Sequence, residues 1–327
     1  MHRRYNLVHL VLLGVIVLVL TPLMVVVDAQ ARITFMSDRS GNPEIYVMDD
    51  NGKNQRRLSN NNFADWDPSW SPDGKRIVFT SSEARGMVGR HRQIYVMDAD
   101  GQNQRRLSNN PIADWHPSWS PDGKRIAFTS SGGRSTADGH WQIYVMDADG
   151  QNPRNLSNDA VDDRGPSWSP DGRHIAFSRR RAGAGLDIYV MNDNGKNQKR
   201  LTKNPSDDRE PSWSPDGKRI AFSSKRDGHW EIYVMNADGE NPRRLTNDPF
   251  FDDRQPSWSP DGKRIAFVSK RDWNMEIYVM NADGGNPQNL TNNDHDDEDP
   301  AWYNPAFVVA PVDKKFTIWG WIKRVDR

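Results

Sequence analysis

Residues 211–222, Pro-Ser-Trp-Ser-Pro-Asp-Gly-Lys-Arg-Ile-Ala-Phe, and residues 232–239, Ile-Tyr-Val-Met-Asn-Ala-Asp-Gly, belong to a unit that recurs along the chain. The tetrapeptide Ile-Tyr-Val-Met returns at intervals of 44 to 49 residues, beginning at Ile45, Ile94, Ile143, Ile188, Ile232 and Ile277. The tryptophan of the first stretch returns at Trp70, Trp119, Trp168, Trp213 and Trp258, and a degenerate copy contains Trp302. Repeats of this length with several strand-like pieces are typical of β-propeller blades.

One unit, residues 117–157, predicts four strands. We expect them at 117–120, 125–130, 142–147 and 154–157. Pro121 and Gly123 occupy the second and fourth positions of the first turn, as a type I turn prefers. The third strand is apolar on both faces, with Ile143 on one and Tyr144 on the other. Such a strand must be covered on both sides, and neighbouring blades of a propeller supply that cover.

The chain ends predict how the ring closes. Residues 33–37 correspond to the second strand of a unit, and residues 301–303 correspond to a first strand with no second strand after it. Six complete blades result only if the C-terminal strand pairs with the N-terminal one. Closure also removes the unpaired interface that an open array would expose. The sequence therefore predicts an all-β, six-bladed propeller of four-stranded antiparallel blades over residues 32–305.

These repeats resemble the WD40-like repeat of TolB-like propellers. The resemblance is carried by the two stretches quoted above and by Arg-Arg-Leu-Thr at residues 243–246, and it extends over residues 33–305. It implies a periplasmic propeller that binds another protein. The resemblance to TolB also implies an α/β domain before the propeller, and the sequence leaves no room for such a domain between Ala31 and Ile33.

Composition and the N-terminus restrict the function classes. Lys plus Arg equals Asp plus Glu at 44 each, so the uniform basic field of a nucleic-acid-binding protein is absent. No cysteine is present, which excludes disulfides and thiolate metal sites. Residues 1–31 have a basic start, an apolar run from Leu7 to Val27 and small residues around Ala31, as a secretory signal peptide does. An uncleaved membrane anchor is the alternative, and either predicts a periplasmic or secreted protein.

The loops at one rim of the propeller are expected to carry recognition. The first-to-second and third-to-fourth turns are nearly identical in all units, whereas the other loops differ, and variable loops on a rigid scaffold are common binding sites. One feature of these loops recurs, an aspartate three residues before each strand-leading proline. These residues are predicted to ring the mouth of the central channel: Asp65, Asp114, Asp163, Asp208, Asp253 and Asp297.

The acidic ring has two interpretations. It could hold a cation or a basic ligand, or each aspartate could have a structural duty within its own loop. For the structural duty we expect arginine partners four residues after a strand phenylalanine, at Arg39, Arg181, Arg226 and Arg271.

Tryptophans outside the repeat gather in the same variable loops. They are Trp66, Trp115, Trp141, Trp230 and Trp273, and the longest loop adds Arg85, Arg90 and Arg92. Aromatic and arginine side chains dominate the hot spots of protein interfaces, and aromatic faces also suit sugars. We expect the sector around Trp66 and Trp115 to be the contact surface. The alternative is that some of these rings pack on a neighbouring blade.

No catalytic motif is present. The sequence lacks a Gly-x-Ser-x-Gly elbow, a His-Glu-x-x-His helix and a phosphate-binding glycine loop. The Asp-x-Asp-Gly-x-Asn turns resemble calcium loops but lack the distal acidic ligand, and they suit tight hairpins. We expect no cofactor, with calcium at the channel mouth as an alternative.

The predicted function is non-catalytic binding, by a monomer, of another exported or envelope protein and not of nucleic acid. Membrane contact is expected only through the N-terminal segment. The alternative is a propeller that binds or cleaves glycans at the channel mouth. In the tail, residues 306–327, apolar positions at helical spacing predict a short amphipathic helix.

Overall fold

The computed structural model describes residues 31–82, 92–109, 112–131, 140–158, 160–181 and 185–303. The predicted leader up to residue 30 and the tail from residue 304 lie outside this part. None of the described residues forms a helix long and apolar enough to cross a membrane.

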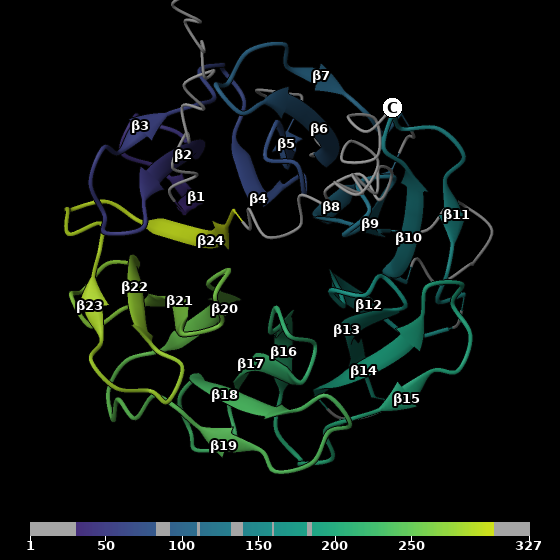
Figure 1. Cartoon of the computed structure of the whole chain (residues 1–327), viewed down its shortest axis with the longest axis vertical. Helices are drawn as coiled ribbons and strands as arrows, with labels where there is room; N and C mark the ends of the chain where they lie inside the picture. The colour runs from purple at the N-terminus through teal and green to yellow at the C-terminus, as the bar shows by residue number, and fades with distance from the viewer. Residues whose placement is uncertain are drawn as a thin grey trace, which may run out of the picture.

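Six four-stranded antiparallel sheets stand around a central axis, so the predicted propeller is confirmed (Figure 1). Blades are numbered here from the N-terminus, and the strands of each are given from the channel outward. Blade 1 contains β24 (Asp297–Trp302), β1 (Arg32–Ser37), β2 (Glu44–Asp49) and β3 (Arg56–Arg57). Blade 2 contains β4 (Asp65–Trp70), β5 (Arg76–Ser82), β6 (Arg92–Asp98) and β7 (Arg105–Arg106). Blade 3 contains β8 (Asp114–Trp119), β9 (Arg125–Ser130), β10 (Gln142–Asp147) and β11 (Arg154–Asn155). Blade 4 contains β12 (Asp163–Trp168), β13 (His174–Arg180), β14 (Leu186–Asn192) and β15 (Lys199–Arg200). Blade 5 contains β16 (Asp208–Trp213), β17 (Arg219–Ser224), β18 (Glu231–Asn236) and β19 (Arg243–Arg244). Blade 6 contains β20 (Asp253–Trp258), β21 (Arg264–Ser269), β22 (Glu276–Asn281) and β23 (Gln288–Asn289).

The core lies between blades rather than within them. Each of six buried clusters joins the second and third strands of one blade to the first strand and second strand of the next. Between blades 3 and 4, for example, Ile143 and Val145 of β10 pack with Trp168 of β12 and Phe177 of β13. The other face of β10 contributes Met146 to the cluster with blade 2. Both faces of the third strand are therefore buried, as its sequence predicts.

Closure of the ring depends on β24, the last strand of the chain. It pairs with β1 in an antiparallel register that places Trp302 opposite Ile33. Tyr303 N–H donates to the Arg32 carbonyl at 2.8 Å beyond the end of the ladder. Trp302 is 7% exposed and packs in the cluster between blades 6 and 1. The two ends of the described chain thus complete blade 1 together.

The six aspartates predicted at the channel mouth are instead buried inside the blades, so that placement is wrong. Asp65, Asp114, Asp163, Asp208, Asp253 and Asp297 all have no exposed surface. Each begins the first strand of its blade and lies opposite the second strand, where five of the six face a serine. This location turns the carboxylates away from solvent and toward the loops of their own blade. The structural interpretation of the aspartates is the one that the geometry supports.

Three of the four predicted arginine partners are confirmed. Arg39 pairs with Asp297 at 2.8 Å, Arg226 with Asp208 at 3.2 Å and Arg271 with Asp253 at 2.9 Å.

Blade 4 differs, because Arg181 pairs with Asp187 at 2.8 Å and Arg179 holds Asp163 at 2.7 Å. Arg179 stands directly opposite Asp163, where other blades have serine, and so reaches the carboxylate first. Asp163 is the one aspartate of the six that faces an arginine across its ladder.

Removing β24 should open the ring. A chain that ends at residue 296 lacks β24 and exposes both the edge of β1 and the cluster around Trp302. Loss of one buried tryptophan alone costs about 3–5 kcal/mol. We expect the melting temperature to fall by roughly 10 °C or more, measured by circular dichroism. A chain that ends at residue 303 is the matched control, and an equal melting temperature for the two truncations would refute closure through β24.

Asp65 should give the fold a measurable pH dependence. Ser81 Oγ at 2.5 Å and Asn61 Nδ2 at 2.9 Å donate to its carboxylate, and burial raises its pKa from 3.8 to about 7. The folded protein therefore binds a proton that the unfolded chain releases between pH 4 and 7, and stability falls as the pH rises through that window.

Asp65→Asn removes this titration. The loss of melting temperature between pH 5 and pH 8 should be smaller in the variant than in the parent protein. Asp100→Asn, on an exposed turn, is the control and should keep the parent's pH dependence. Identical pH profiles for all three proteins would show that Asp65 does not titrate in this range.

Candidate functional site

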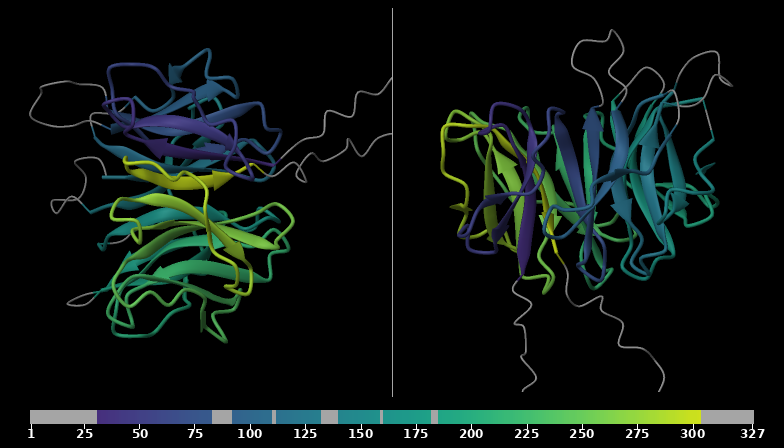
Figure 2. Two further views of the ribbon diagram at one scale, coloured as in Figure 1. Left: turned by 90° about the vertical axis from the view of Figure 1, so that its left-hand side faces the viewer. Right: turned by 90° about the horizontal axis from the view of Figure 1, so that it is seen from above.

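The two rims of the propeller differ in how much their loops vary. The near-identical turns that follow the first and third strands form one rim, which we call the turn-rich rim. There the described chain begins at β1 and ends at β24 (Figure 2). The loops that follow the second and fourth strands form the opposite, loop-rich rim. Differences between blades are therefore collected on one face, as the sequence predicts.

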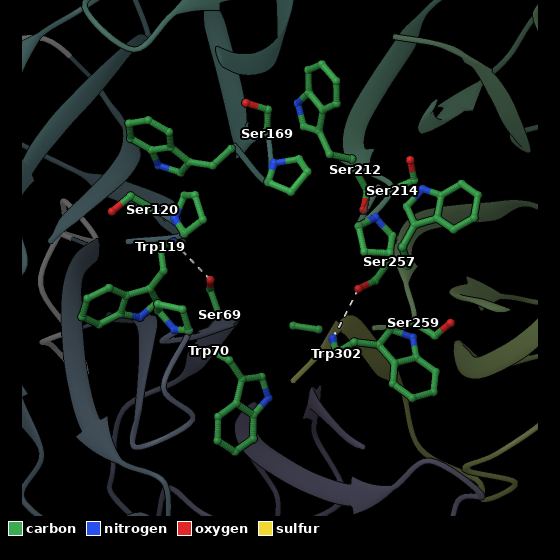
Figure 3. Close-up of a pocket in the computed structure, with 18 of the residues that line it drawn as sticks. Ser69, Trp70, Trp119, Ser120, Ser169, Ser212, Ser214, Ser257, Ser259 and Trp302 are labelled. Carbon is green, nitrogen blue, oxygen red and sulfur yellow. Dashed lines mark hydrogen bonds between the residues drawn. The ribbon is translucent and has the colours of Figure 1, made fainter. Parts of the chain in front are cut away.

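The channel on the turn-rich side is uniform. A cavity of about 220 Å³ is lined by the serine, tryptophan and proline residues of the repeated Pro-Ser-Trp-Ser-Pro run, with Ala301 in the degenerate copy (Figure 3). Neighbouring blades are linked there by Ser69 Oγ, which accepts from Trp119 N–H at 3.4 Å, and by the equivalent bond from Trp302 to Ser257 at 3.3 Å. None of the residues that line this cavity carries a charge. A wall that is the same in every blade offers little specificity.

The channel mouth at the loop-rich rim differs from blade to blade. A cavity of about 170 Å³ is lined by a ring of six prolines and by the residue before each of them. Those preceding residues are Asp67, His116, Gly165, Glu210, Gln255 and Asp299. All six of these residues have a left-handed backbone, with φ between 50° and 61°. Three carboxylates, an imidazole, an amide and a glycine thus stand at equivalent places. Strained backbone that recurs around a cavity is a common property of functional sites.

A β-bulge explains why the sequence analysis missed this ring. The first strand of each blade was expected to begin at its proline, for example at Pro117. It begins instead at the buried aspartate, here Asp114, and the register shifts between Trp115 and Ser118. The bulge turns the residue before the proline into the channel and the aspartate into the blade. The available signal was that this residue varies between units while the aspartate does not.

Hydrogen bonds hold the carboxylates of the mouth in place. Asp67 N–H donates to Asp299 Oδ2 at 3.1 Å, and Asp299 N–H donates to Gln255 Oε1 at 3.2 Å. Glu210 Oε2 accepts from Ser223 Oγ at 2.7 Å. Burial raises the pKa of Asp299 well above its usual range, and the charge of Asp67 acts in the same direction. Within the described residues, no group of three His, Asp or Glu side chains is placed to hold a metal ion.

The predicted tryptophan sector is assembled by the structure. Arg92 lies between Trp66 and Trp115, with its guanidinium carbon 4.4 Å and 4.7 Å from the two ring centroids. Trp141 packs against Trp115 at 4.4 Å between centroids. All three rings are half-buried. Arg85 and Arg90 lie outside the described residues.

The other two predicted tryptophans have opposite exposures. Trp230 is 4% exposed and lies beneath Arg209, whose guanidinium carbon is 3.7 Å from the ring centroid, so it packs within the propeller. Trp273 is 83% exposed and has a left-handed backbone with φ 75°, which is rare for a bulky residue. Phe250, which the sequence analysis did not single out, is 77% exposed on the same blade.

Comparisons of sequence with known proteins match short parts of the chain. The family model described as TolB beta propeller domain matches residues 163–254, and that of the dipeptidyl peptidase IV N-terminal region matches residues 18–137. The Tol-Pal system protein TolB of Geobacter sulfurreducens is 44% identical over 46 residues, which are 14% of this chain and 11% of that protein. TolB of Desulfosudis oleivorans is 35% identical over 57 residues, 17% of this chain and 13% of that protein. The matches thus span about a tenth of each relative's length.

Comparisons of structure extend over most of the chain. TolB from Acinetobacter baumannii superposes with a TM-score of 0.71 at 24% identity, covering 84% of this chain and 67% of that one. Hydrazine synthase of Kuenenia stuttgartiensis gives a TM-score of 0.70 at 17% identity and covers 84% of this chain and 47% of that one. At these identities the likeness shows the fold alone. Together with the repeated sequence and the six blades, the comparisons show that the chain folds as a β-propeller whose repeats are similar to those of TolB.

Proposed function

We propose that this protein is an exported, non-catalytic scaffold that recognises a protein partner through its loop-rich rim. The observation that carries the proposal is the cluster of Trp66, Arg92, Trp115 and Trp141 on that rim. The proposal of export rests on the composition of residues 1–31.

The cluster has the properties of an interface hot spot. Tryptophan and arginine are enriched among the residues that dominate binding energy, especially where they are partly desolvated. Here Arg92 is held between two rings, and Trp141 braces the second ring. Side chains that are ordered before binding lose less conformational entropy when a partner arrives. The rigid blades below supply that order.

A binding role also agrees with the state of the mouth. The carboxylates of Asp67, Glu210 and Asp299 already accept hydrogen bonds from neighbouring residues of the chain. A catalytic acid or base needs an oxygen that reaches a substrate. Carboxylates that already accept hydrogen bonds within the protein are better suited to structural and recognition roles than to catalysis.

One observation favours a second candidate, a propeller that cleaves glycans at the channel mouth. The buried aspartates recur in every blade, but the mouth residues Asp67, Glu210 and Asp299 are specific to their blades. Two carboxylates of different environment are the usual machinery of glycoside hydrolysis. Release of reducing ends from a polyuronate, lost in Glu210→Gln, would establish this activity in place of the proposed one.

The tryptophan cluster gives the test of the binding proposal. The full chain is used to capture a partner from an extract of envelope proteins, and the affinity of that partner is then measured for Trp66→Ala/Trp115→Ala. Because hot-spot residues each contribute about 2 kcal/mol or more, we expect the affinity to fall at least roughly thirtyfold. Circular dichroism should show an intact fold.

Lys75→Ala/Lys124→Ala is the matched control. Both lysines are exposed in the same two blades, on turns of the opposite rim, and their loss should leave the affinity unchanged. Equal affinities for the parent protein and the double tryptophan variant would exclude this sector as the contact surface.

A further inference from the structure

Three neighbouring blades place an arginine at the same position of the loop-rich rim. The residue after the buried aspartate is tryptophan in blades 2 and 3, and it is Arg164, Arg209 and Arg254 in blades 4, 5 and 6. Because the blades repeat around an axis, these three side chains form an arc beside the channel mouth, which we call the arginine arc. Figure 1 shows their strands, β12, β16 and β20, in consecutive blades at the channel.

Arg209 is held in place without a hydrogen-bonding partner for its guanidinium. The group lies 3.7 Å from the centroid of the buried Trp230 ring. Its Nε is buried and lacks a partner, and none of the ion pairs of the described chain includes it. A guanidinium placed over a ring can still donate from its terminal N–H groups to a planar anion. The tryptophan thus serves as a platform and the arginine as the group that can contact a ligand.

The other two arginines of the arc are also incompletely paired. The one hydrogen-bonding contact of Arg254 in the described structure is to Met275 Sδ at 3.9 Å, which is weak. Arg164 contacts Asp162 at 3.1 Å and the Trp141 ring at 5.7 Å, and its buried Nε has no partner. By contrast, Arg271 of the same rim donates to Ser269 Oγ and to both carboxylate oxygens of Asp253.

Nearby carboxylates do not neutralise Arg209 by direct contact. Asp207 Oδ1 accepts from Leu186 N–H at 2.7 Å, and Glu210 Oε2 accepts from Gln255 N–H at 3.0 Å. Burial lowers the pKa of Arg209, the charges of Glu210 and Asp207 oppose this, and the charges of Arg254 and Arg164 add to the lowering. The three cations therefore repel one another, and the Glu298 carboxyl near Arg254 offsets part of that repulsion. An anion bound among the arginines would relieve more of it.

Exposed aromatic side chains adjoin the arc on blade 6. Phe250 and Phe251 precede β20, which carries Arg254, and Trp273 stacks edge-on against Phe251 at 5.3 Å between centroids. Phe250 and Trp273 are the large apolar side chains that the described structure leaves exposed. The left-handed backbone of Trp273 holds its ring in solvent at a cost in free energy. A ligand of this surface would gain from apolar groups as well as from anions.

We propose that the arginine arc binds the carboxylates of an acidic polypeptide segment, while Phe250 and Trp273 contact its apolar side chains. This inference rests on the proposed function, since it names the chemistry of the protein partner. A peptide fits better than an acidic glycan, because the rings that carry an arginine are covered by its guanidinium and Trp273 is the one exposed tryptophan of the described structure. Arg209 lies over Trp230, and Arg92 lies over Trp66 and Trp115.

The test uses an array of ten-residue peptides that contain Phe, Ser and one to four Glu in all orders, together with a matching array that has Gln in place of Glu. The full chain should bind a subset of the Glu peptides, and the Gln peptides should not bind. Fluorescence anisotropy with the best peptide should show weaker binding at higher salt concentration. Failure of every Glu peptide to bind, or equal binding of the Gln array, would overturn the proposal.

The variant Arg209→Gln/Arg254→Gln should weaken the binding of the best peptide at least about tenfold, because it removes charge-assisted hydrogen bonds to the Glu carboxylates. Arg105→Gln/Arg154→Gln removes two exposed arginines from outer strands and should leave affinity unchanged. Unchanged affinity in the arc variant, or tighter binding of oligogalacturonate than of any peptide, would contradict the proposal. A captured protein whose affinity depends on Trp66 and Trp115 but not on the arc would leave the proposed function standing and refute this inference alone.

Discussion

Each third strand of this protein is apolar on both faces, and the rest of the structure depends on that constraint. Ile143 and Val145 pack against the next blade while Met146 packs against the previous one. A single blade therefore cannot bury its own apolar surface, and each must lie between two neighbours. A row of such blades is complete only as a ring, which is why the last strand must return to the first blade. The pairing of Trp302 with Ile33 follows from the same requirement.

The buried aspartates connect this core to the loop-rich rim. A carboxylate with no exposed surface is costly unless it is paired or hydrogen-bonded, and here arginine, serine or asparagine supplies the partners. The serines lie on the second strands, whereas arginines such as Arg39, paired with Asp297, and Arg271, paired with Asp253, come from the loops. The loops are thereby fastened to the blades at one repeated point, and their other residues can differ. Similar anchoring in each blade is what permits different chemistry above it.

Much of the fold follows from the sequence because its signals are periodic. The second and third strands of the third blade were predicted at the residues where they occur, 125–130 and 142–147, and closure by the last strand was predicted from the same repeat. The site was less predictable because it depends on departures from the repeat. A bulge before each proline exchanges the positions of the aspartate and its second neighbour, and an alternating pattern does not reveal a bulge. Likewise, Arg179 and not the predicted Arg181 pairs with Asp163, because Arg179 lies opposite Asp163 in the ladder. Only the strand register determines which residue takes that place.

The tryptophans of the rim show how an aromatic ring can position a neighbouring cation. They lie in the variable loops of one rim, and the ring faces of Trp66, Trp115 and Trp230 lie against guanidinium groups. An aromatic ring beneath an arginine limits the conformations of a long side chain and leaves its N–H edge available. Composition alone does not distinguish a ring that contacts a ligand from a ring that positions a cation. Spatial order makes the distinction, and it is the reason for our proposal that the rim recognises anions.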